Sequence, residues 1–406
     1  MNVSGPADII VAGHICLDMI PTMYESQSDI AALLLPGKLI NIGPAVMSTG
    51  GAVSNTGIAL HRLGSQVKLM GKIGGDPFGQ IILTLLRGQD PSLVEGMIVS
   101  PKETSSYSIV ISPPNRDRTF LHATGANDTF SAADLNQEQL QGARLFHFGY
   151  PPLMKKMYEH EGVELLRLLK KVKESGVTVS LDLAKPDPSS PAGRVDWRAI
   201  LTQAMPFVDV CLPSFEELVY MLDRELFDAM EQEAPEGDLL SYADGELLAR
   251  LSSELIGMGA AIVVIKLGEH GIYVRTTSDK RRLPQMGLDA PEQDWLNCEI
   301  ISSCYEVDVV GTTGAGDCTI AGFLFGLTQG LTLSETLHCA VGVGACNVEQ
   351  ADATSGITEW AAIRERMNNG WKKQAMKLNL TNWHANGDQL WIGPHHKSSK
   401  ASVISE

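Results

Sequence analysis

The chain lacks long apolar runs and an excess of basic residues. No apolar run approaches the roughly 18 residues of a membrane span, and the first 20 residues lack the basic start of a secretion signal. We therefore expect no membrane association and no signal peptide. Lys and Arg number 32 against 48 Asp and Glu, a formal charge of −16. This balance argues against a nucleic-acid partner, because a phosphate-backbone binder carries a basic face.

Several familiar motifs are also missing. The seven cysteines form no C-x-x-C pair, and an odd, unclustered count is typical of a reducing compartment, so we expect a cytoplasmic protein. The ten histidines include no H-E-x-x-H motif, so the sequence predicts no zinc site. The chain has no G-x-x-x-x-G-K-[ST] loop, and no G-x-G-x-x-G follows the first predicted strand. P-loop and dinucleotide folds are thereby excluded.

Short β-branched runs alternate with helical segments along the 406 residues. Strands are predicted at 9–12, 67–70, 144–148, 177–181, 207–211, 261–266 and 271–274. Helices are predicted at 54–63, 78–87, 163–175, 216–222, 247–258, 316–328 and 333–348. This alternation predicts an α/β fold, a three-layer sandwich in which helices cover both faces of a mainly parallel central sheet. The core is expected to comprise residues 7–23, 49–96 and 122–370.

Two stretches, residues 24–48 and 97–121, break the alternation. Neither offers a helix for a crossover connection, which predicts a small separate β-sheet that could act as a lid. The alternative is permanent edge structure that is buried in a homodimer formed through the lid. Residues 371–406 are expected to form a C-terminal extension. Its end, from about Ala385, is polar and aperiodic and is expected to fray.

The strongest motif is the run GTTGAGDC at residues 311–318, ahead of an apolar helical segment. Gly314, Ala315 and Gly316 would let the backbone approach a ligand closely. The N–H groups of a first helical turn carry the positive end of the helix dipole, which suits charge on a transferring phosphoryl group. Asp317, in the same turn, could accept a proton from an attacking hydroxyl. Taken alone, a capped helix whose first-turn aspartate complements the dipole explains the pattern equally well.

A second glycine pair, Gly50 and Gly51, opens the predicted helix at 54–63. Asn55 in that helix could bond hydroxyl groups. Asp18 follows the first predicted strand, at the edge where α/β sheets bind ligands. On their own, these patterns are more typical of a capped tight turn and a loop aspartate.

Together the motifs resemble the ribokinase-like, or PfkB, carbohydrate kinase family over residues 7–356. Residues 50–63 resemble its N-terminal signature, and residues 312–323 resemble its C-terminal one. The run GKIGGDPFG at 71–79 is similar to the segment that follows the first signature in members. The run KLGEHG at 266–271 is similar to the family's nucleotide-side strand turn. Both signatures occur in the family's order, which makes the resemblance specific.

The resemblance implies phosphoryl transfer from ATP to a hydroxyl of a small-molecule acceptor, a sugar or sugar-like compound. It implies Asp317 as the catalytic base and the turn Gly314-Ala315-Gly316 as the anion hole. Two further sets of residues correspond to binding positions of the family. The acceptor's hydroxyls would be bound by Asp18, Gly51 and Asn55, and the adenine and ribose site would be lined by Lys266, Gly268 and Gly271.

The resemblance also implies Mg²⁺, which Glu217 would help to organise through water. Ser214 replaces the usual Asn of that Asn-x-x-Glu motif. Gly311 stands where many members have an Asp of a monovalent-cation site, so we expect weak potassium activation. Asp182 begins only a part of the Asp-x-Asn-x-Arg segment found in some sugar-acid kinases. Two alternatives stay open, a nucleoside or sugar-phosphate kinase of the same fold and a non-catalytic ligand-binding regulator.

Overall fold

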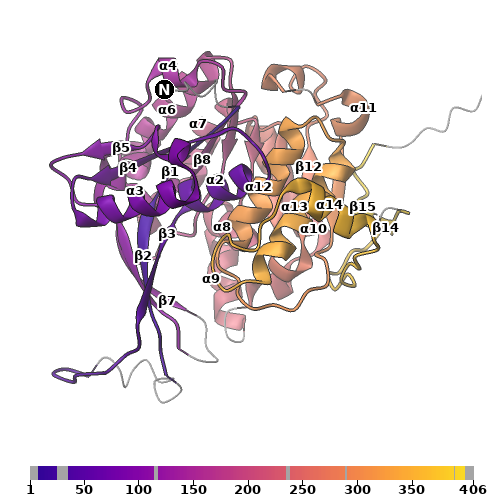
Figure 1. Ribbon diagram of the computed structural model, residues 1–406. Helices are drawn as coiled ribbons and strands as arrows, with labels where there is room; N and C mark the ends of the chain where they lie inside the picture. Colours follow the sequence, from indigo (N-terminus) through magenta and orange to yellow (C-terminus); the bar gives the residue numbers. More distant parts are fainter. Residues whose placement is uncertain are drawn as a thin grey trace, which may run out of the picture.

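The computed structural model describes residues 8–24, 35–113, 118–234, 238–288, 290–387 and 389–397. Helices cover both faces of a large central sheet, and a small second sheet projects from this body (Figure 1). The predicted fold class is confirmed. No helix in the described ranges is both long and apolar enough to cross a membrane.

The central sheet is built from strands that are short and largely buried. They are β1 (Ile9–Gly13), β4 (Val67–Gly74), β5 (Ile98–Ser100), β8 (Leu145–Gly149), β9 (Thr178–Leu181), β10 (Val210–Cys211), β11 (Ile262–Lys266), β12 (Ile272–Thr276), β13 (Glu299–Ser302), β14 (His384–Ala385) and β15 (Leu390–Ile392). Their order is β14-β15-β13-β12-β11-β10-β9-β8-β1-β4-β5. The strands from β11 to β5 run parallel, and those from β12 to β14 pair antiparallel.

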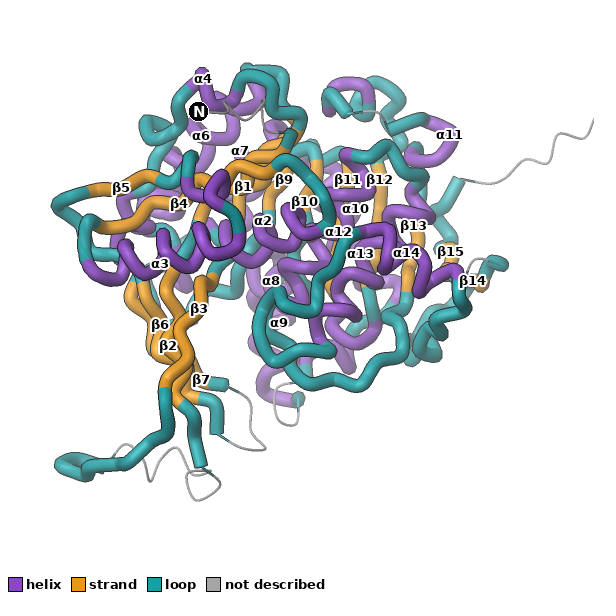
Figure 2. The backbone as a smooth tube through the Cα atoms, in the orientation of Figure 1, coloured by secondary structure: helices purple, strands orange, loops and turns teal. Residues whose placement is uncertain are grey.

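Two apolar clusters lie on opposite faces of this sheet. Ile9 and Val11 of β1 belong to one cluster and Ile10 and Ala12 to the other, as the period of two in a strand requires. The first face is covered by α2 (Ala52–Arg62), α3 (Pro77–Gln89), α12 (Ala315–Thr328), α13 (Leu333–Val348) and α14 (Trp360–Asn368), with α11 (Glu292–Trp295) near the edge (Figure 2). The second face is covered by α4 (Gln137–Leu140), α5 (Lys155–Tyr158), α6 (Val163–Glu174), α7 (Trp197–Ala204), α8 (Phe215–Leu222), α9 (Arg224–Glu233) and α10 (Gly245–Met258).

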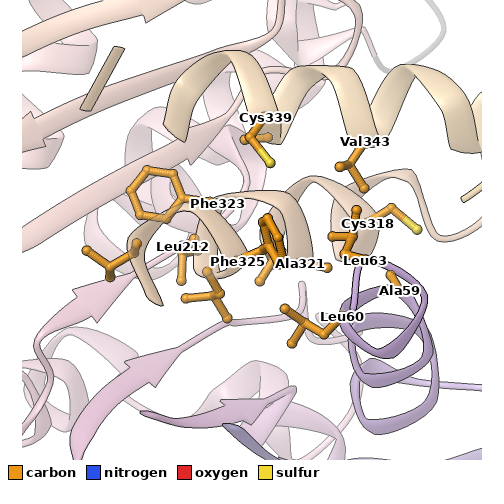
Figure 3. Packing of buried hydrophobic residues seen from close by; sticks show 14 of the residues in the cluster. Ala59, Leu60, Leu63, Leu212, Cys318, Ala321, Phe323, Phe325, Cys339 and Val343 are labelled. Atoms are coloured by element: carbon orange, nitrogen blue, oxygen red, sulfur yellow. The ribbon is translucent and has the colours of Figure 1, made fainter. Parts of the chain in front are cut away.

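Helix α12 is apolar on all sides because it lies between two other helices. Figure 3 shows Ala59 and Leu60 of α2 and Leu63 just after it on one side, and Cys339 and Val343 of α13 on the other. Nearly every residue of α12 is buried. The start of α12 is therefore held firmly beside the start of α2, although the two lie far apart in the sequence.

The small sheet has the order β3 (Ala45–Gly50), β2 (Cys16–Pro21), β6 (Tyr107–Ile111) and β7 (Thr119–Ala123). Its strand bounds differ from the predicted division. Residues 16–21, assigned to the core, form β2 of the small sheet, and residues 98–100, assigned to the lid, form β5 of the central sheet. The chain bends after β1 at Gly13, whose φ is +123°, and β2 then joins the small sheet. The predicted lid residues 25–34 and 114–117 lie outside the described residues.

The predicted fraying from Ala385 is wrong for the described part of the C-terminus. Strand β15 pairs with β13, and β14 pairs with β15. The buried Glu299 carboxylate accepts the N–H of His395 at 2.8 Å, which holds the chain beyond β15. Such short strands carry no sequence pattern of their own, because they form only on an edge that already exists. Residues 398–406 lie outside the described residues.

Candidate active site

Asp317 lies in the first turn of α12 and is only 3% exposed. Its carboxylate accepts hydrogen bonds from Asn55 Nδ2 and the Tyr150 hydroxyl, both at 2.9 Å. Thr56 Oγ1 lies 3.4 Å from Oδ1. Burial raises the pKa of Asp317, while the hydrogen bond from Asn55 and the charge of Lys266 oppose that rise. The result is a fixed carboxylate that takes up a proton more readily than an exposed aspartate does.

Helix α2 brings Asn55 to this carboxylate because the helix starts immediately after Gly51. The φ of Gly51 is +87°, and a Cβ there would lie 2.5 Å from Nδ1 of His14, so only glycine fits. The other amide atom of Asn55, Oδ1, is buried without a hydrogen-bond partner among the described residues. Buried polar atoms are nearly always paired. Asn55 Oδ1 can therefore accept a hydrogen bond from a bound hydroxyl group.

Tyr150 is a site residue that the sequence analysis missed. It follows β8 directly and has a left-handed backbone, with φ 65° and ψ 47°. Burial raises the pKa of Tyr150 well above its usual value, and the charge of Asp317 raises it further. The phenol therefore stays protonated and acts as a donor. A tyrosine at the carboxyl end of a parallel strand, just before Pro151 and Pro152, was the available signal.

The turn ahead of α12 borders the polar cavity, and the N–H of Ala315 within it donates to the carbonyl oxygen of Thr312 at 3.3 Å. Gly314 has φ +72°, and a Cβ there would lie 2.7 Å from the carbonyl oxygen of Ala353, so this position also requires glycine. No side chain caps α12, whereas Ser214 caps α8 and Thr332 caps α13. Unpaired first-turn N–H groups form a ready anion site. The role of this turn as an anion hole stays a prediction.

A buried ion pair lies beside this turn. Lys266 Nζ is 2.7 Å from Oδ1 of Asp182, and the Lys266 side chain would contact a Cβ on Gly316 at 3.7 to 3.9 Å. Burial raises the pKa of Asp182, and Lys266 opposes that rise. Burial lowers the pKa of Lys266, but the carboxylates of Asp182 and Glu217 outweigh it, so the net shift is upward. Lys266 therefore carries its positive charge next to the anion site.

Two cavities meet at the turn. One of about 350 Å³ is lined by Tyr150, Ser214, Glu217, Lys266, Thr312 and the residues 314–317. The other, of about 320 Å³, is mainly apolar and is lined by Gly268, Gly271, Ile272, Tyr305, Val341 and Ala345, among others. Lys266, Gly268, Ala315 and Gly316 line both. The apolar cavity is suited to a flat ring, and the polar one is suited to charged or hydroxylated groups.

Glu217 contributes a carboxylate to the polar cavity. Its Oε2 accepts the N–H of Ser214 at 2.7 Å, and Ser214 Oγ accepts the N–H of Glu217 at 3.4 Å. This reciprocal pair is a capping box for α8. Ser214 thus serves the helix start. A carboxylate has further lone pairs beyond the one that Ser214 uses, so Glu217 can still accept from water.

Asp18 lies on the small sheet rather than at the end of a core strand. Cys16 Sγ donates to its Oδ1 at 3.3 Å, and Gly50 leaves room for its carboxylate, because a Cβ on Gly50 would overlap it. Burial raises the pKa of Asp18. The small sheet also reaches the turn before α12, since Arg118 donates to Thr312 Oγ1 at 2.9 Å. The sequence analysis missed Arg118, because no pattern links residues 194 positions apart.

The structure therefore brings most of the predicted site residues together. Asp317, Glu217, Lys266 and the turn 314–316 line one cavity, and Asn55 contacts Asp317 directly. Gly268 lines both cavities, and Gly271 lines only the apolar one. Asp18 and Gly51 lie apart from these cavities. Gly51 lies against His14, whose ring centroid is 6.1 Å from that of Tyr150.

Comparison with known proteins defines the class of enzyme. The model of the pfkB family carbohydrate kinases matches residues 6–360, so the chain belongs to that family. A probable fructokinase-4 of Arabidopsis thaliana is 25% identical over 324 residues, which cover 79% of this chain and 82% of the relative. The ribokinase of Lactococcus lactis is 24% identical over 324 residues, covering 79% and 86%.

Solved structures show the same fold. An Arabidopsis thaliana ribokinase complexed with ribose and ATP aligns with a TM-score of 0.66 at 18% identity, covering 89% of this chain and 98% of that one. A putative ribokinase II of E. coli in complex with ATP and Mg²⁺ aligns at 0.62 and 18%, covering 89% and 99%. The protein is thus an ATP-dependent sugar kinase, which phosphorylates a hydroxyl of a sugar or sugar-like molecule.

Proposed function

We propose that the enzyme phosphorylates a free sugar, with Asp317 as the base that activates the acceptor hydroxyl. One observation carries this proposal. The Asp317 carboxylate is buried and held by Asn55 and Tyr150 at the uncapped start of α12, where the polar and the apolar cavity meet. A general base must lie within reach of the acceptor hydroxyl, and that hydroxyl must lie next to the phosphorus that its oxygen attacks.

In this mechanism the acceptor lies on the side of α2 and the small sheet. Asn55 Oδ1 and the Asp18 carboxylate accept hydrogen bonds from its hydroxyl groups, and Gly51 leaves room for it. The reacting hydroxyl passes its proton to Asp317 as its oxygen attacks the γ-phosphorus in line. The N–H groups of Gly314, Ala315 and Gly316 stabilise the negative charge on the transferring group, because the positive end of α12 points there.

ATP would bind along the turn with its base in the apolar cavity between Gly268 and Gly271. The ammonium group of Lys266 lies beside Gly316 and would attract the phosphates. Mg²⁺ would be held through water by Glu217, and it supplies positive charge that offsets the phosphates during transfer. The donor set fits, because Mg²⁺ usually keeps several waters and uses one or two carboxylates.

Purified enzyme assayed for ADP release against sugars, nucleosides and sugar phosphates tests this function. We expect release with a free sugar, because the Arabidopsis thaliana and Lactococcus lactis relatives are named a probable fructokinase and a ribokinase. Turnover of nucleosides or sugar phosphates alone would instead favour the alternative acceptors. Tight sugar binding without ADP release from any acceptor would identify a non-catalytic regulator.

We also propose that the small sheet is a lid and that two chains form a homodimer through it in the cytoplasm. Leu39, Val46 and Phe120 of this region are exposed by 89%, 61% and 53%. Val46 lies on β3 and Phe120 on β7, the two edge strands of the small sheet, and exposed edge strands tend to pair with another chain. Sedimentation of the wild type and of Val46→Asp tests the homodimer: the wild type should sediment as a dimer and the variant as a monomer. A monomeric wild type at micromolar concentration would contradict it.

A further inference from the structure

Two imidazoles and a thiol meet at the base of the lid, where the proposed reaction does not use them. His14 follows β1, Cys16 begins β2 and His122 lies on β7. Their ligand atoms all lie within 4.8 Å of one another. Among the residues that the structure describes, no other group of His, Cys, Asp and Glu has this geometry. His14 and Cys16 lie two positions apart and His122 comes from a distant segment, so no sequence motif links all three.

The distance between the two rings is the one that a metal ion imposes. Nε2 of His14 lies 3.2 Å from Nε2 of His122. Two zinc–nitrogen bonds of about 2.0–2.1 Å at a tetrahedral angle separate their nitrogen atoms by about 3.3 Å. An ion could therefore be bound with almost no movement of the rings. The thiol of Cys16 completes a set of two nitrogens and one sulfur, which is typical of zinc and similar borderline metals.

His122 is oriented by a neighbour as metal-binding histidines usually are. Its Nδ1 lies 2.9 Å from Oγ of Ser108 on β6, the strand that pairs with β7. If Nδ1–H donates to Ser108, Nε2 carries the lone pair and faces His14. Such a partner on the second ring nitrogen sets the tautomer and the ring angle of a ligand. Ser108 thus has the position of a supporting residue for a metal site.

The surroundings allow an ion to enter the cluster. His14 is 2% exposed and Cys16 4%, whereas His122 faces solvent and provides a route for the ion. Binding would form two metal–nitrogen bonds and one metal–sulfur bond. The thiol proton of Cys16 would leave to solvent through Asp18, to which it already donates.

We propose that His14, Cys16 and His122 bind one divalent transition-metal ion of the zinc class, which ties lid strand β7 to the turn after β1. This proposal does not depend on the role of Asp317. The ion would lie on the acceptor side of the site, because the ring of His14 is 6.1 Å from that of Tyr150. The rival interpretation of the same geometry is a simple N–H···N hydrogen bond between two neutral rings.

Cobalt binding to the metal-stripped full-length enzyme distinguishes a metal site from a simple hydrogen bond between the rings. We expect one equivalent of Co²⁺ to give the charge-transfer absorption of a cobalt–thiolate bond, and Zn²⁺ to displace it. Cys16→Ser should abolish that absorption. Cys304→Ser, which removes the one half-buried cysteine of the described chain, should leave it intact. Absence of the absorption in the wild type, or its loss only in Cys304→Ser, would overturn the proposal.

His122→Gln keeps the test decisive if Cys16→Ser fails to fold, because residue 122 is exposed. Zn²⁺ should raise the melting temperature of the wild type and leave that of His122→Gln unchanged, since only binding to the folded state stabilises it. Ser108→Ala should weaken Co²⁺ binding about 10- to 100-fold, the usual effect of removing a supporting residue. Equal zinc shifts in the wild type and His122→Gln would show that the rings only share a hydrogen bond.

Discussion

The hydroxyl of Tyr150 lies 2.9 Å from both carboxylate oxygens of Asp317 and donates its proton to that carboxylate. Tyr150 follows the end of β8, and Asp317 lies at the start of α12. The contact therefore joins the central sheet to a helix that comes much later in the sequence. With Asn55 it leaves the carboxylate little freedom to rotate. Such fixation is what a general base needs, because its oxygen must lie on the path of the proton.

Replacing Asp317 by Asn should remove proton acceptance while keeping size and most hydrogen bonds. We expect kcat to fall by about 10² to 10⁴, the range for lost general-base catalysis. Affinity for ATP and acceptor should change little, as calorimetric titration would show. Asp279→Asn, on the exposed loop pair with Arg281, is the matched control and should retain full activity. More than half of the wild-type turnover in Asp317→Asn would rule out this base.

The pH dependence of kcat/KM should report the raised pKa of Asp317. Only the ionised carboxylate accepts a proton, and burial raises its pKa. Activity should therefore fall, as the pH is lowered, at a higher pH than for an ordinary aspartate. Tyr150→Phe removes a donor that stabilises the ionised form, so it should move this fall to still higher pH. If kcat/KM of Tyr150→Phe falls at the same pH as that of the wild type, a group other than Asp317 controls the pH dependence.

Potassium should activate the enzyme weakly. Gly311 supplies no carboxylate, and a Cβ there would already lie 3.0 Å from the Gln350 carbonyl oxygen, which leaves little room for a larger side chain. We measure the rate of ADP release in buffer free of potassium and sodium and then add potassium. The rate should change less than about twofold, which corresponds to roughly 0.4 kcal/mol in the activation barrier. A large rise would mean that backbone carbonyls alone form the cation site.

Hydrogen exchange should reveal the lid. Saturating acceptor should slow exchange in β2, β3, β6 and β7, because closure excludes water from the reacting groups. An ATP analogue alone should act mainly on residues 266–271 and 314–317. Arg118→Gln should weaken the protection of β7, since it breaks the contact with Thr312. Exchange in the lid strands that does not respond to acceptor would indicate permanent edge structure.

The C-terminal strands should contribute to stability through Glu299. This buried carboxylate lies 3.1 Å from Arg275 and also accepts the N–H of His395. Glu299→Gln leaves Arg275 without its counter-charge and should cost about 3 to 5 kcal/mol in the free energy of unfolding. Arg281→Gln, which breaks the exposed pair with Asp279, should cost under about 1 kcal/mol. Urea unfolding measures both, and equal effects would contradict the anchoring role.

The sequence alone was sufficient for the parts of the site that are local. Gly314 to Asp317 lie in one helical turn, so glycine geometry and helix polarity predict their arrangement without any knowledge of the fold. The alternation of strands and helices likewise predicts the three-layer sandwich, because each element must bury one face. The ion pair of Lys266 with Asp182 was not foreseen.

The contacts between distant segments were decided only by the tertiary structure. Tyr150 and Asn55 reach Asp317 because strand β8 ends where helices α2 and α12 begin, and no spacing in the sequence records that meeting. The same holds for Arg118 on Thr312 and for the cluster of His14, Cys16 and His122. The sequence determined which chemical groups the chain carries and which turns they occupy. The packing of α2, α12 and the lid on one sheet decided which groups touch, because apolar burial sets those distances and carries no pairwise signature along the chain.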